Sequence, residues 1–455
     1  MRILIIAEVY LPKVDGVVRR TMNLIRELLS EGDEILVVCP TQDEVAQSPV
    51  PVVGFPGFSF LLYPEYCIGR PDDRLTKVVA DFQPDVVHFI NPFAFGFQCY
   101  DLLQHSGTNF ASVFSFHTLY AEFVKRYPVL RPLSSVLWWL TRHYHNHSDV
   151  NLTVSTVALE DLRRRGFRNV DLWRPAVDSD LFHPRSACSE MRRRLSGDFP
   201  DRKLLLTASR LAPEKDIEFL AEVLRQVPEA MLAIVGDGPH RAALERHFRG
   251  LPVHFTGYLH GEDLAAAYAS ADAFVYASRT ETMGNVVLEA MACAAPLVAP
   301  AAGGISGLVD HGVNGLLYSP GNITEAAAFV RTLLEDQEQR QRISEAAREY
   351  ASGCSWSEAA RGVRRAYERA IERHRALVSD LPRSTLTARL VTRLLVNSFA
   401  LMSSLKRPAK STSTLTAAST AEPASVSAPV LLPNTGISEP TFPAELSPES
   451  VGALT

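Results

Sequence analysis

The fold is decided by the stretch Ile3-Leu-Ile-Ile-Ala7 and by the longer stretch that follows it, Val17-Val-Arg-Arg-Thr-Met-Asn-Leu-Ile-Arg-Glu-Leu-Leu-Ser30. The first run is short and continuously apolar, which is typical of a strand buried on both faces of a parallel sheet. The second run repeats apolar residues at the period of a helix, at positions 17, 18, 22, 25, 28 and 29. A buried strand followed by an amphipathic helix is the repeating unit of doubly wound α/β proteins.

The same alternation of strand and helix continues along the chain in two series. The first series predicts further strands at residues 35–39, 86–90, 112–116 and 152–155. After a connector that contains prolines, the second series predicts strands at residues 204–207, 232–235, 254–256, 274–276 and 297–299. Doubly wound sheets bind ligands at the carboxyl ends of their strands. The sequence therefore predicts an α/β protein with two facing doubly wound, Rossmann-like domains and an inter-domain cleft.

The length of 455 residues exceeds that of a usual single core, so several parts are expected. The connector contains Pro175 and Pro184, which interrupt regular secondary structure, so we expect the domain boundary there. The end of the chain is rich in Ser, Thr, Ala and Pro, so we expect it to be disordered. The expected parts are a first domain at 1–178, a second at 179–355, a helix at 356–376 that packs back on the first domain, a basic amphipathic segment at 377–409 and a disordered tail at 410–455.

Composition narrows the class of protein. The formal net charge of -5 argues against a general nucleic-acid binder. The six cysteines form no CxxC pair, which favours a reducing, cytoplasmic compartment. Glu8 interrupts the first apolar run too early for a signal peptide. No run reaches the roughly 18 to 20 apolar residues that a membrane span needs, so any contact with a membrane is expected at its surface.

The stretch Glu281-Thr-Met-Gly-Asn-Val-Val-Leu-Glu289 follows an apolar run and opens a predicted helix. The two carboxylates would lie roughly 12 Å apart, whereas the paired acids of a glycosidase lie about 5 to 9.5 Å apart. That separation matches a nucleotide diphosphate, and the amides at a helix N-terminus bind anions. The two acids would then face hydroxyl groups at either end. The alternative interpretation is a solvated loop acid followed by an unrelated helix acid.

Two further features follow strands of the second domain. Ser209-Arg210-Leu-Ala-Pro-Glu-Lys215 places a guanidinium and an ammonium after its first strand, a pairing suited to a diphosphate. Gly236-Asp-Gly238-Pro forms the turn after the next strand, where glycine lets the backbone approach a ligand closely. The alternatives are a solvated turn for the cations and a plain βα turn for the glycines.

Two features of the first domain complete the set of candidates. Asp15-Gly16 enters the first helix without a full GxGxxG fingerprint, which disfavours a dehydrogenase. His117 ends an apolar strand and could donate to a sugar hydroxyl, although a satisfied core histidine is the alternative. Asp178-Ser-Asp180 matches an acid-x-acid metal pattern, but it lies in the connector, so we expect no metal site.

Together these motifs resemble the retaining GT-B glycosyltransferases of family 4, over most of residues 1 to 375. The most specific part is Glu281 to Glu289 followed by Ala-Met-Ala. The order of the other motifs strengthens the resemblance: Asp15-Gly16, His117, Arg210 with Lys215, Gly236-Asp-Gly238-Pro, Phe255-Thr-Gly257, the acid pair, and Gly303-Gly304. The resemblance makes the first domain the acceptor side and the second the nucleotide-sugar-binding side.

The resemblance implies catalytic roles for four residues: His117, Arg210, Lys215 and Glu281. It implies donor-binding roles for six more: Gly16, Gly236, Met283, Gly284, Asn285 and Glu289. Arg210 and Lys215 would hold the donor diphosphate, with the Gly16 amide near the phosphate or acceptor. Glu281 would contact the hydroxyls of the donor sugar, Glu289 the ribose, and His117 would line the sugar pocket. The sugar would leave with retained configuration and without a metal or other cofactor, through positioning and charge stabilisation.

Within the family, the chain is most similar to sulfoquinovosyltransferases, which make sulfolipid, and to related lipid mannosyltransferases. The sequence stretches on which this similarity rests are residues 115–118, 171–184, 190–196 and 267–272. Three positions depart from the family pattern. Met283 stands where Phe or Leu is common, Ala294-Ala295-Pro296 replaces Gly-x-Pro, and Gly304-Ile-Ser306-Gly307 lacks the usual Pro-acid pair. These positions border the donor sugar, so the departures concern its identity.

Two segments point to a lipid acceptor. Leu137-Trp138-Trp139-Leu140 contains adjacent tryptophans, which are costly to expose unless something apolar covers them, with burial in the first domain as the alternative. Residues 383–410 contain six Lys or Arg and no acid, as in an amphipathic anchor for anionic lipid, with a loose basic tail as the alternative.

The expected function is therefore transfer of a sugar to a lipid such as diacylglycerol, from UDP-sulfoquinovose, a UDP-hexose or GDP-mannose. The enzyme would be cytoplasmic, on the inner face of a membrane. Two alternatives remain open: a family 4 transferase with a soluble or polysaccharide acceptor, and a catalytically silent scaffold that binds nucleotide sugars.

Overall fold

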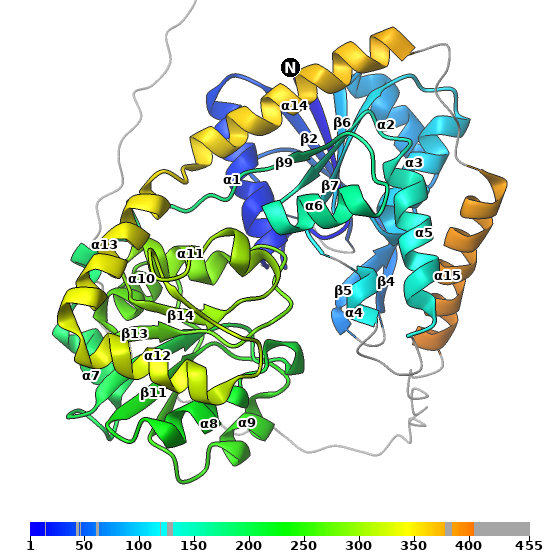
Figure 1. Cartoon of the computed structure of the whole chain (residues 1–455). Helices are drawn as coiled ribbons and strands as arrows, with labels where there is room; N and C mark the ends of the chain where they lie inside the picture. Colours follow the sequence, from blue (N-terminus) through cyan, green and yellow to red (C-terminus); the bar gives the residue numbers. More distant parts are fainter. Residues whose placement is uncertain are drawn as a thin grey trace, which may run out of the picture. The chain divides into compact units, whose positions relative to one another are not determined.

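In a computed structural model of the protein, the described residues are 1–13, 15–41, 45, 47–60, 63–118, 120–124, 131–377 and 385–404. They contain two parallel sheets, of seven and six strands, with helices on both faces of each (Figure 1). The predicted class, an α/β protein with two doubly wound sheets, is confirmed. The predicted tail at 410–455 lies outside the described residues.

The first sheet has the strand order β3-β2-β1-β6-β7-β8-β9. Its strands are β1 (Arg2–Ala7), β2 (Glu34–Pro40), β3 (Val52–Phe55), β6 (Val86–Ile90), β7 (Ala111–Phe116), β8 (Val150–Thr153) and β9 (Val170–Leu172). A separate antiparallel ribbon pairs β4 (Gly57–Phe60) with β5 (Tyr63–Gly69). The connecting helices are α1 (Gly16–Ser30), α2 (Arg74–Phe82), α3 (Ala94–His105), α4 (Tyr120–Phe123), α5 (Leu133–His145) and α6 (Thr156–Arg164).

The continuous apolar run of β1 is explained by burial on both faces of this sheet. Ile3 and Ile5 pack in one cluster with residues of α1 and α14 (Trp356–Leu377). Leu4 and Ile6 pack on the opposite face with residues of α3 and α5. Because successive side chains of a strand point to opposite faces, a doubly covered strand must be apolar throughout.

The second sheet has the order β12-β11-β10-β13-β14-β15. Its strands are β10 (Lys203–Ala208), β11 (Ala230–Val235), β12 (Val253–Gly257), β13 (Ala273–Val275), β14 (Leu297–Pro300) and β15 (Leu316–Tyr318). Its helices are α7 (Ser189–Ser196), α8 (Phe219–Gln226), α9 (Arg241–His247), α10 (Gly261–Ser270), α11 (Asn285–Ala292), α12 (Ile323–Glu335) and α13 (Gln337–Ser352). Three 3-10 turns lie at η2 (Pro184–Ser186), η3 (Pro213–Lys215) and η4 (Gly303–Gly307).

Most of the predicted strands are extended at one or both ends in the structure, and two are shifted toward the N-terminus. The strand predicted at 152–155 lies at Val150–Thr153, because Ser155 instead caps α6 through a hydrogen bond from the Ala158 amide to its Oγ. The strand predicted at 274–276 is Ala273–Val275. Five strands were not predicted, namely β3, β4, β5, β9 and β15, and two of them, β9 and β15, are only three residues long.

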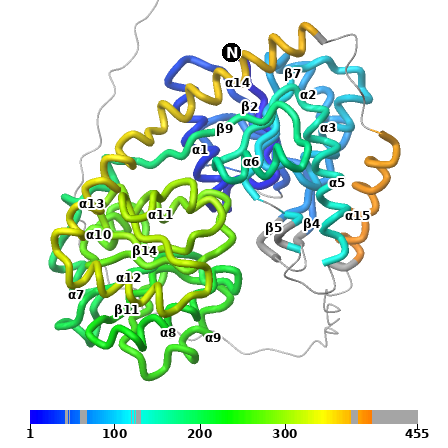
Figure 2. The backbone as a smooth tube through the Cα atoms, viewed as in Figure 1, coloured from blue at the N-terminus to red at the C-terminus, as the bar shows by residue number. Residues whose placement is uncertain are grey.

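The last two helices both contact the first sheet or the helices that cover it (Figure 2). α14 packs on β7 and α1, and its Tyr367 hydroxyl lies 2.8 Å from Nδ1 of His88 in β6. α15 (Leu386–Ser404) packs on α3, α5 and β4. The predicted basic segment at 377–409 is thus described only in part, and its described portion is mainly this helix. Among the described residues, no helix is long and apolar enough to cross a membrane.

Candidate active site

The acid-pair stretch forms a loop that leads into α11, as predicted. The helix begins at Asn285, and Gly284 precedes it with φ +95°, a conformation that favours glycine. Two further glycines, Gly303 and Gly304, pack against the backbone of this loop. The Gly304 amide donates to the Glu281 carbonyl at 2.7 Å, and a Cβ at Gly304 would lie 2.2 Å from the Thr282 carbonyl oxygen. Close backbone approach therefore explains the glycines at this position.

The carboxylate of Glu281 is held by residues that follow two neighbouring strands, β10 and β13. The Lys215 ammonium donates to Oε1 at 2.6 Å, and the Tyr276 hydroxyl donates to the same oxygen at 2.9 Å. Burial opposes ionisation of Glu281, but the Lys215 charge and the hydrogen bonds outweigh it, so the pKa of Glu281 lies below its ordinary value. The structure thus joins two predicted site residues, one cationic and one anionic.

The carboxylate of Glu289 is buried in α11 and contacts both domains. Arg19 of α1 donates to its Oε1 at 2.9 Å, and the Tyr268 hydroxyl of α10 donates to Oε2 at 3.1 Å. Burial raises the pKa of Glu289, although Arg19 and Tyr268 oppose the shift. The sequence analysis did not identify Arg19 as a site residue. Its only distinguishing feature in the sequence is a basic side chain one turn into the first helix.

The start of α1 lies against the start of α11. A Cβ at Gly16 would lie 3.0 Å from Nδ2 of Asn285, so glycine permits this approach. Asp15 caps the helix, because its Oδ1 accepts from the Val17 and Val18 amides, each at 2.9 Å. These two amides are therefore already engaged, and the role of the Gly16 amide near the phosphate or acceptor stays a prediction.

His117 lies at the end of β7 and is almost fully buried. Its Nε2 is 3.0 Å from Ser115 Oγ, and its ring meets the Trp173 ring edge-on at 5.1 Å. Burial, then the nearby Arg20 and His88, hold the pKa of His117 well below its ordinary value. His117 is thus a neutral, packed side chain, and its predicted role in the sugar pocket stays a prediction.

Arg20 lies between Trp173, against which His117 also packs, and the loop of the second domain. Its Nη1 donates to Met283 Sδ at 3.1 Å, and its guanidinium carbon lies 4.5 Å from the centre of the Trp173 ring. The Nη2 group donates to the carbonyls of Trp173, at 2.9 Å, and Arg174. Sequence reasoning missed Arg20, because nothing in its local pattern distinguishes it from a solvated helix residue.

Gly236 has a structural reason to be glycine. Its φ is +130°, and a Cβ there would lie 1.9 Å from the Ser209 carbonyl oxygen. Its amide donates to the Gly257 carbonyl at 2.8 Å. The geometry favours the βα-turn interpretation, and the donor-binding role of Gly236 stays a prediction. Arg210 follows Ser209 in the loop that also carries Lys215.

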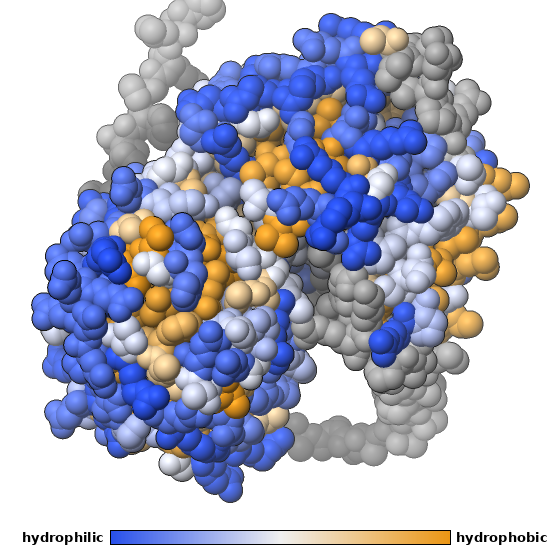
Figure 3. All heavy atoms as spheres, in the orientation of Figure 1, coloured by the Kyte–Doolittle hydropathy of each residue, from blue (hydrophilic) through white to orange (hydrophobic). Residues whose placement is uncertain are grey.

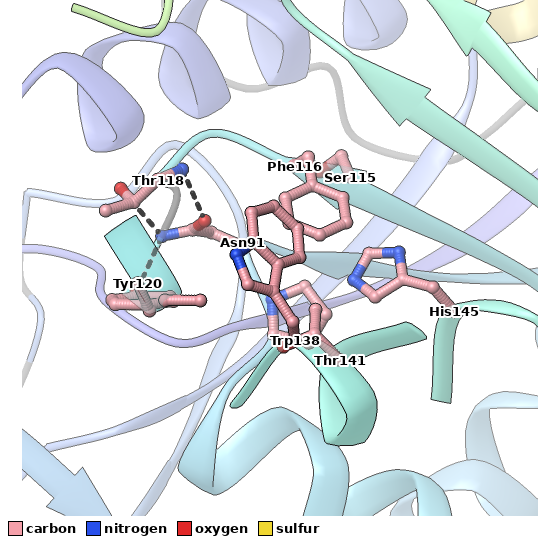
Figure 4. A pocket seen from close by; sticks show the side chains of 10 residues that line it. Asn91, Ser115, Phe116, Thr118, Tyr120, Trp138, Thr141 and His145 are labelled. Atoms are coloured by element: carbon pink, nitrogen blue, oxygen red, sulfur yellow. Dashed lines mark hydrogen bonds between the residues drawn. The ribbon is translucent and has the colours of Figure 1, made fainter. Parts of the chain in front are cut away.

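A small pocket lies at the carboxyl ends of β6 and β7 (Figure 4). Asn91 lines the pocket, donates to the Tyr120 hydroxyl at 2.7 Å and accepts from the Thr118 amide at 2.9 Å. The residues of the Leu137–Leu140 segment of α5 lie in different environments. Leu137 and Leu140 are buried and Trp138 lines the pocket, whereas Trp139 is 36% exposed. Burial thus accounts for part of this segment, but not for Trp139.

Models of two protein families match the two halves of the chain. The model described as Glycosyltransferase Family 4 matches residues 14–181, and the model described as Glycosyl transferases group 1 matches residues 190–350. These ranges include the start of α1 and the whole of the acid-pair stretch.

Curated relatives and a solved structure agree with these matches. The sulfoquinovosyl transferase SQD2 of Arabidopsis thaliana is 35% identical over 360 residues, which cover 77% of this chain and 70% of the relative. A GDP-mannose-dependent alpha-mannosyltransferase of Mycolicibacterium smegmatis is 37% identical over 329 residues, covering 70% and 84%. The structure of Anabaena HepE with UDP and glucose superimposes with a TM-score of 0.63 at 20% identity, covering 81% of this chain and 99% of HepE. This chain therefore belongs to the family 4, group 1 glycosyltransferases and has the GT-B fold.

Proposed function

We propose that this glycosyltransferase moves a sugar from a nucleoside diphosphate donor to a lipid such as diacylglycerol, with retained configuration and without a metal ion or other cofactor. The observation that carries the proposal is the contact of Lys215 with Glu281 beside the N-terminus of α11. A cation next to a helix start suits a diphosphate, and a carboxylate next to it suits sugar hydroxyls. The UDP in the HepE complex supports a nucleotide donor.

The donor would lie along the loop between the two acids. Arg210 and Lys215 would neutralise the charge that develops on the leaving diphosphate, which is the main electrostatic demand of the reaction. Glu281 and Glu289 would accept hydrogen bonds from the sugar and the ribose. In this structure Lys215 donates to Glu281 and Arg19 donates to Glu289. Donor binding would replace these hydrogen bonds by hydrogen bonds from the donor hydroxyls. The names of the relatives support a sulfoquinovosyl donor or GDP-mannose. We therefore propose UDP-sulfoquinovose and GDP-mannose as candidate donors, with a UDP-hexose as the third.

The acceptor side of the proposal rests on α15. One face of this helix packs on the first domain, through residues such as Ala388 and Val396. The outer face carries leucines that are 49% to 65% exposed, namely Leu386, Leu390, Leu394 and Leu401. Figure 3 shows apolar atoms gathered along this helix. Leu395, in contrast, packs against the core.

Charge favours an anionic membrane surface as the partner of this leucine face. Arg389 and Arg393 belong to the same helix, which contains no acid. Arg70 adds a third cation, because its Nη2 donates to Asn397 at 3.0 Å. Exposed leucines flanked by arginines are the composition of helices that lie in a membrane interface. The enzyme would then work at the cytoplasmic face of a membrane, where its lipid acceptor resides.

The first experiment measures release of nucleoside diphosphate from UDP-sulfoquinovose, UDP-glucose and GDP-mannose, with diacylglycerol vesicles or with soluble sugars as acceptors. Diacylglycerol-dependent release with formation of a glycolipid is the expected result. Release with soluble sugars alone would favour the competing soluble-acceptor transferase. Donor binding without release under any condition would instead favour the silent scaffold.

The second experiment tests the leucine face. Leu390→Glu with Leu394→Glu should abolish sedimentation with vesicles that contain phosphatidylglycerol, because two charges would be forced into the interface. The matched control changes two exposed apolar residues of the second domain, Tyr258→Glu with Val313→Glu, and should leave sedimentation unchanged. Equal vesicle binding by both double variants would refute the assignment of α15.

A further inference from the structure

Three buried polar atoms at and beside the indole of Trp173 have no hydrogen-bond partner among the residues that the structure describes. They are Nε of Arg20, Nε1 of Trp173 and Nε2 of His88. The side chains are close together: the Arg20 guanidinium carbon lies 4.5 Å from the centre of the Trp173 ring, and the His88 and Trp173 rings are 5.8 Å apart. None of the three residues is more than 2% exposed. We call this group the Trp173 cluster.

The Trp173 cluster carries a positive charge that the described residues do not balance. Within the described ranges, Arg20 forms no ion pair. Its partners are the carbonyls of Trp173 and Arg174, the sulfur of Met283 and the ring faces of Trp173 and Trp356. Burial lowers the pKa of Arg20 to about 9, so the guanidinium is still a cation at neutral pH. Buried charges are ordinarily paired, because an unpaired one loses its hydration without compensation.

The position of the cluster indicates where a compensating group would come from. Arg20 touches Met283, which belongs to the loop that would hold the donor. His117, which would line the sugar pocket, packs edge-on against Trp173. The cluster therefore borders the sugar end of the proposed donor site from the side of the first domain.

We propose that the Trp173 cluster recognises an oxyanion carried by the donor sugar, such as a sulfonate. This rests on the proposed function, because it takes the donor to lie against Met283 and His117. A sulfonate offers three acceptor oxygens and a full negative charge, which matches the Nε–H of Arg20 and the Nε1–H of Trp173 beside a buried cation. His88 Nε2 adds a third donor in the tautomer that places the ring proton there. Water or a sugar hydroxyl could satisfy the N–H groups, but would leave the charge of Arg20 unbalanced.

The test compares two donors that differ in one substituent. UDP-sulfoquinovose carries a sulfonate where UDP-glucose carries a hydroxyl, and their dissociation constants can be measured by calorimetry on the full chain. The native protein should bind UDP-sulfoquinovose at least about tenfold more tightly. Arg20→Gln should remove this preference and leave the affinity for UDP-glucose within about threefold. The matched control is Arg26→Gln, an exposed arginine of the same helix, which should keep the preference.

A second variant keeps the inference testable if Arg20→Gln does not fold. Trp173→Phe removes the Nε1 donor and keeps an aromatic ring beside Arg20, so it should weaken binding of UDP-sulfoquinovose severalfold with little change for UDP-glucose. A merely structural role of Arg20, in holding the carbonyls of residues 173 and 174, predicts an equal loss for both donors. Equal losses, or a native protein without preference for the sulfonate, would refute the inference. Turnover of UDP-glucose onto diacylglycerol would in that case still support the proposed function.

Discussion

The contact between Lys215 and Glu281 gives each residue a measurable role. Lys215 keeps Glu281 ionised against the cost of burial, because the ammonium lies 2.6 Å from the carboxylate. When the donor binds, the same ammonium would face the diphosphate. One side chain thus sets the charge state of its neighbour and would stabilise the leaving group.

We expect Lys215→Ala to lower kcat/KM by about 10² to 10³, or roughly 3 to 4 kcal/mol of transition-state stabilisation. The fold should persist, because the Lys215 side chain is partly exposed. Steady-state kinetics with a saturating lipid acceptor would measure the effect. Lys203→Ala, which changes an exposed lysine of the same domain, is the control and should retain normal kinetics. Near-normal turnover in folded Lys215→Ala would contradict the phosphate role.

Glu8 is a second residue whose partners define its role. Its carboxylate accepts from four amides at the start of α3, those of Phe93, Ala94, Phe95 and Gly96, at 2.9 to 3.0 Å. Burial raises its pKa even though the four amides oppose the shift. Glu8→Gln replaces one acceptor oxygen by an N–H donor that faces the amides. We expect a loss of about 2 to 3 kcal/mol in the free energy of unfolding, measured by urea denaturation, whereas Glu34→Gln at the exposed start of β2 should change it little.

At the scale of elements, glycine turns connect the loops of the second domain. The turn after β11 packs its Gly236 directly on the backbone of the loop after β10. The η4 glycines pack in the same way under the acid-pair loop. Because the contacts are between backbones, no side-chain movement can accommodate a larger residue.

Gly236→Ala should therefore destabilise the second domain by several kcal/mol, since its Cβ would meet the Ser209 carbonyl oxygen at 1.9 Å. Gly250→Ala is the matched comparison, because its φ is also positive, +83°, but nothing lies within 4 Å of its Cβ. It should cost only about 1 kcal/mol, from backbone strain alone. Thermal unfolding would rank the two variants, and equal stability would show that the turn moves to relieve the contact.

At the scale of the whole molecule, buried histidines connect stability to pH. Burial lowers the pKa of His88 and of His145 to about 3 each, and it lowers that of His117 too. In the unfolded chain these groups titrate near pH 6.5. Below that pH the unfolded state binds more protons than the folded state, so stability falls as pH falls. Glu8 and Glu289, whose pKa values are raised, act in the opposite direction.

A variant isolates the histidine contribution from these opposing acids. His145→Gln should be destabilised at pH 7.5, because the packing of His145 on Phe116 and its contact with Asn151 are lost. At pH 5.5 the difference in free energy of unfolding between wild type and variant should shrink by about 1.4 kcal/mol, the cost of leaving one histidine uncharged one pH unit below its unfolded pKa. Urea denaturation at both values measures it. A constant difference would mean that folded His145 accepts a proton.

The amino-acid sequence by itself determined the two doubly wound sheets and the helix start after the acid-pair loop. These features depend on local periodicity and on glycine at a required backbone conformation, as in the apolar run at β1 and in Gly284, so neighbouring residues suffice to predict them. Short strands such as β9 and β15 carry too few residues to show a period.

Only the tertiary structure decided which side chains meet. Arg19 reaches Glu289 across 270 positions of sequence, and Arg20 reaches Met283 across 263. Such contacts depend on how two separately folded sheets approach each other, which no local pattern records. The same reason explains Gly236, whose sequence suggested a ligand turn and whose packing on Ser209 accounts for the glycine. Local pattern therefore predicts elements, whereas the partners of each site residue follow from the packing of the two domains.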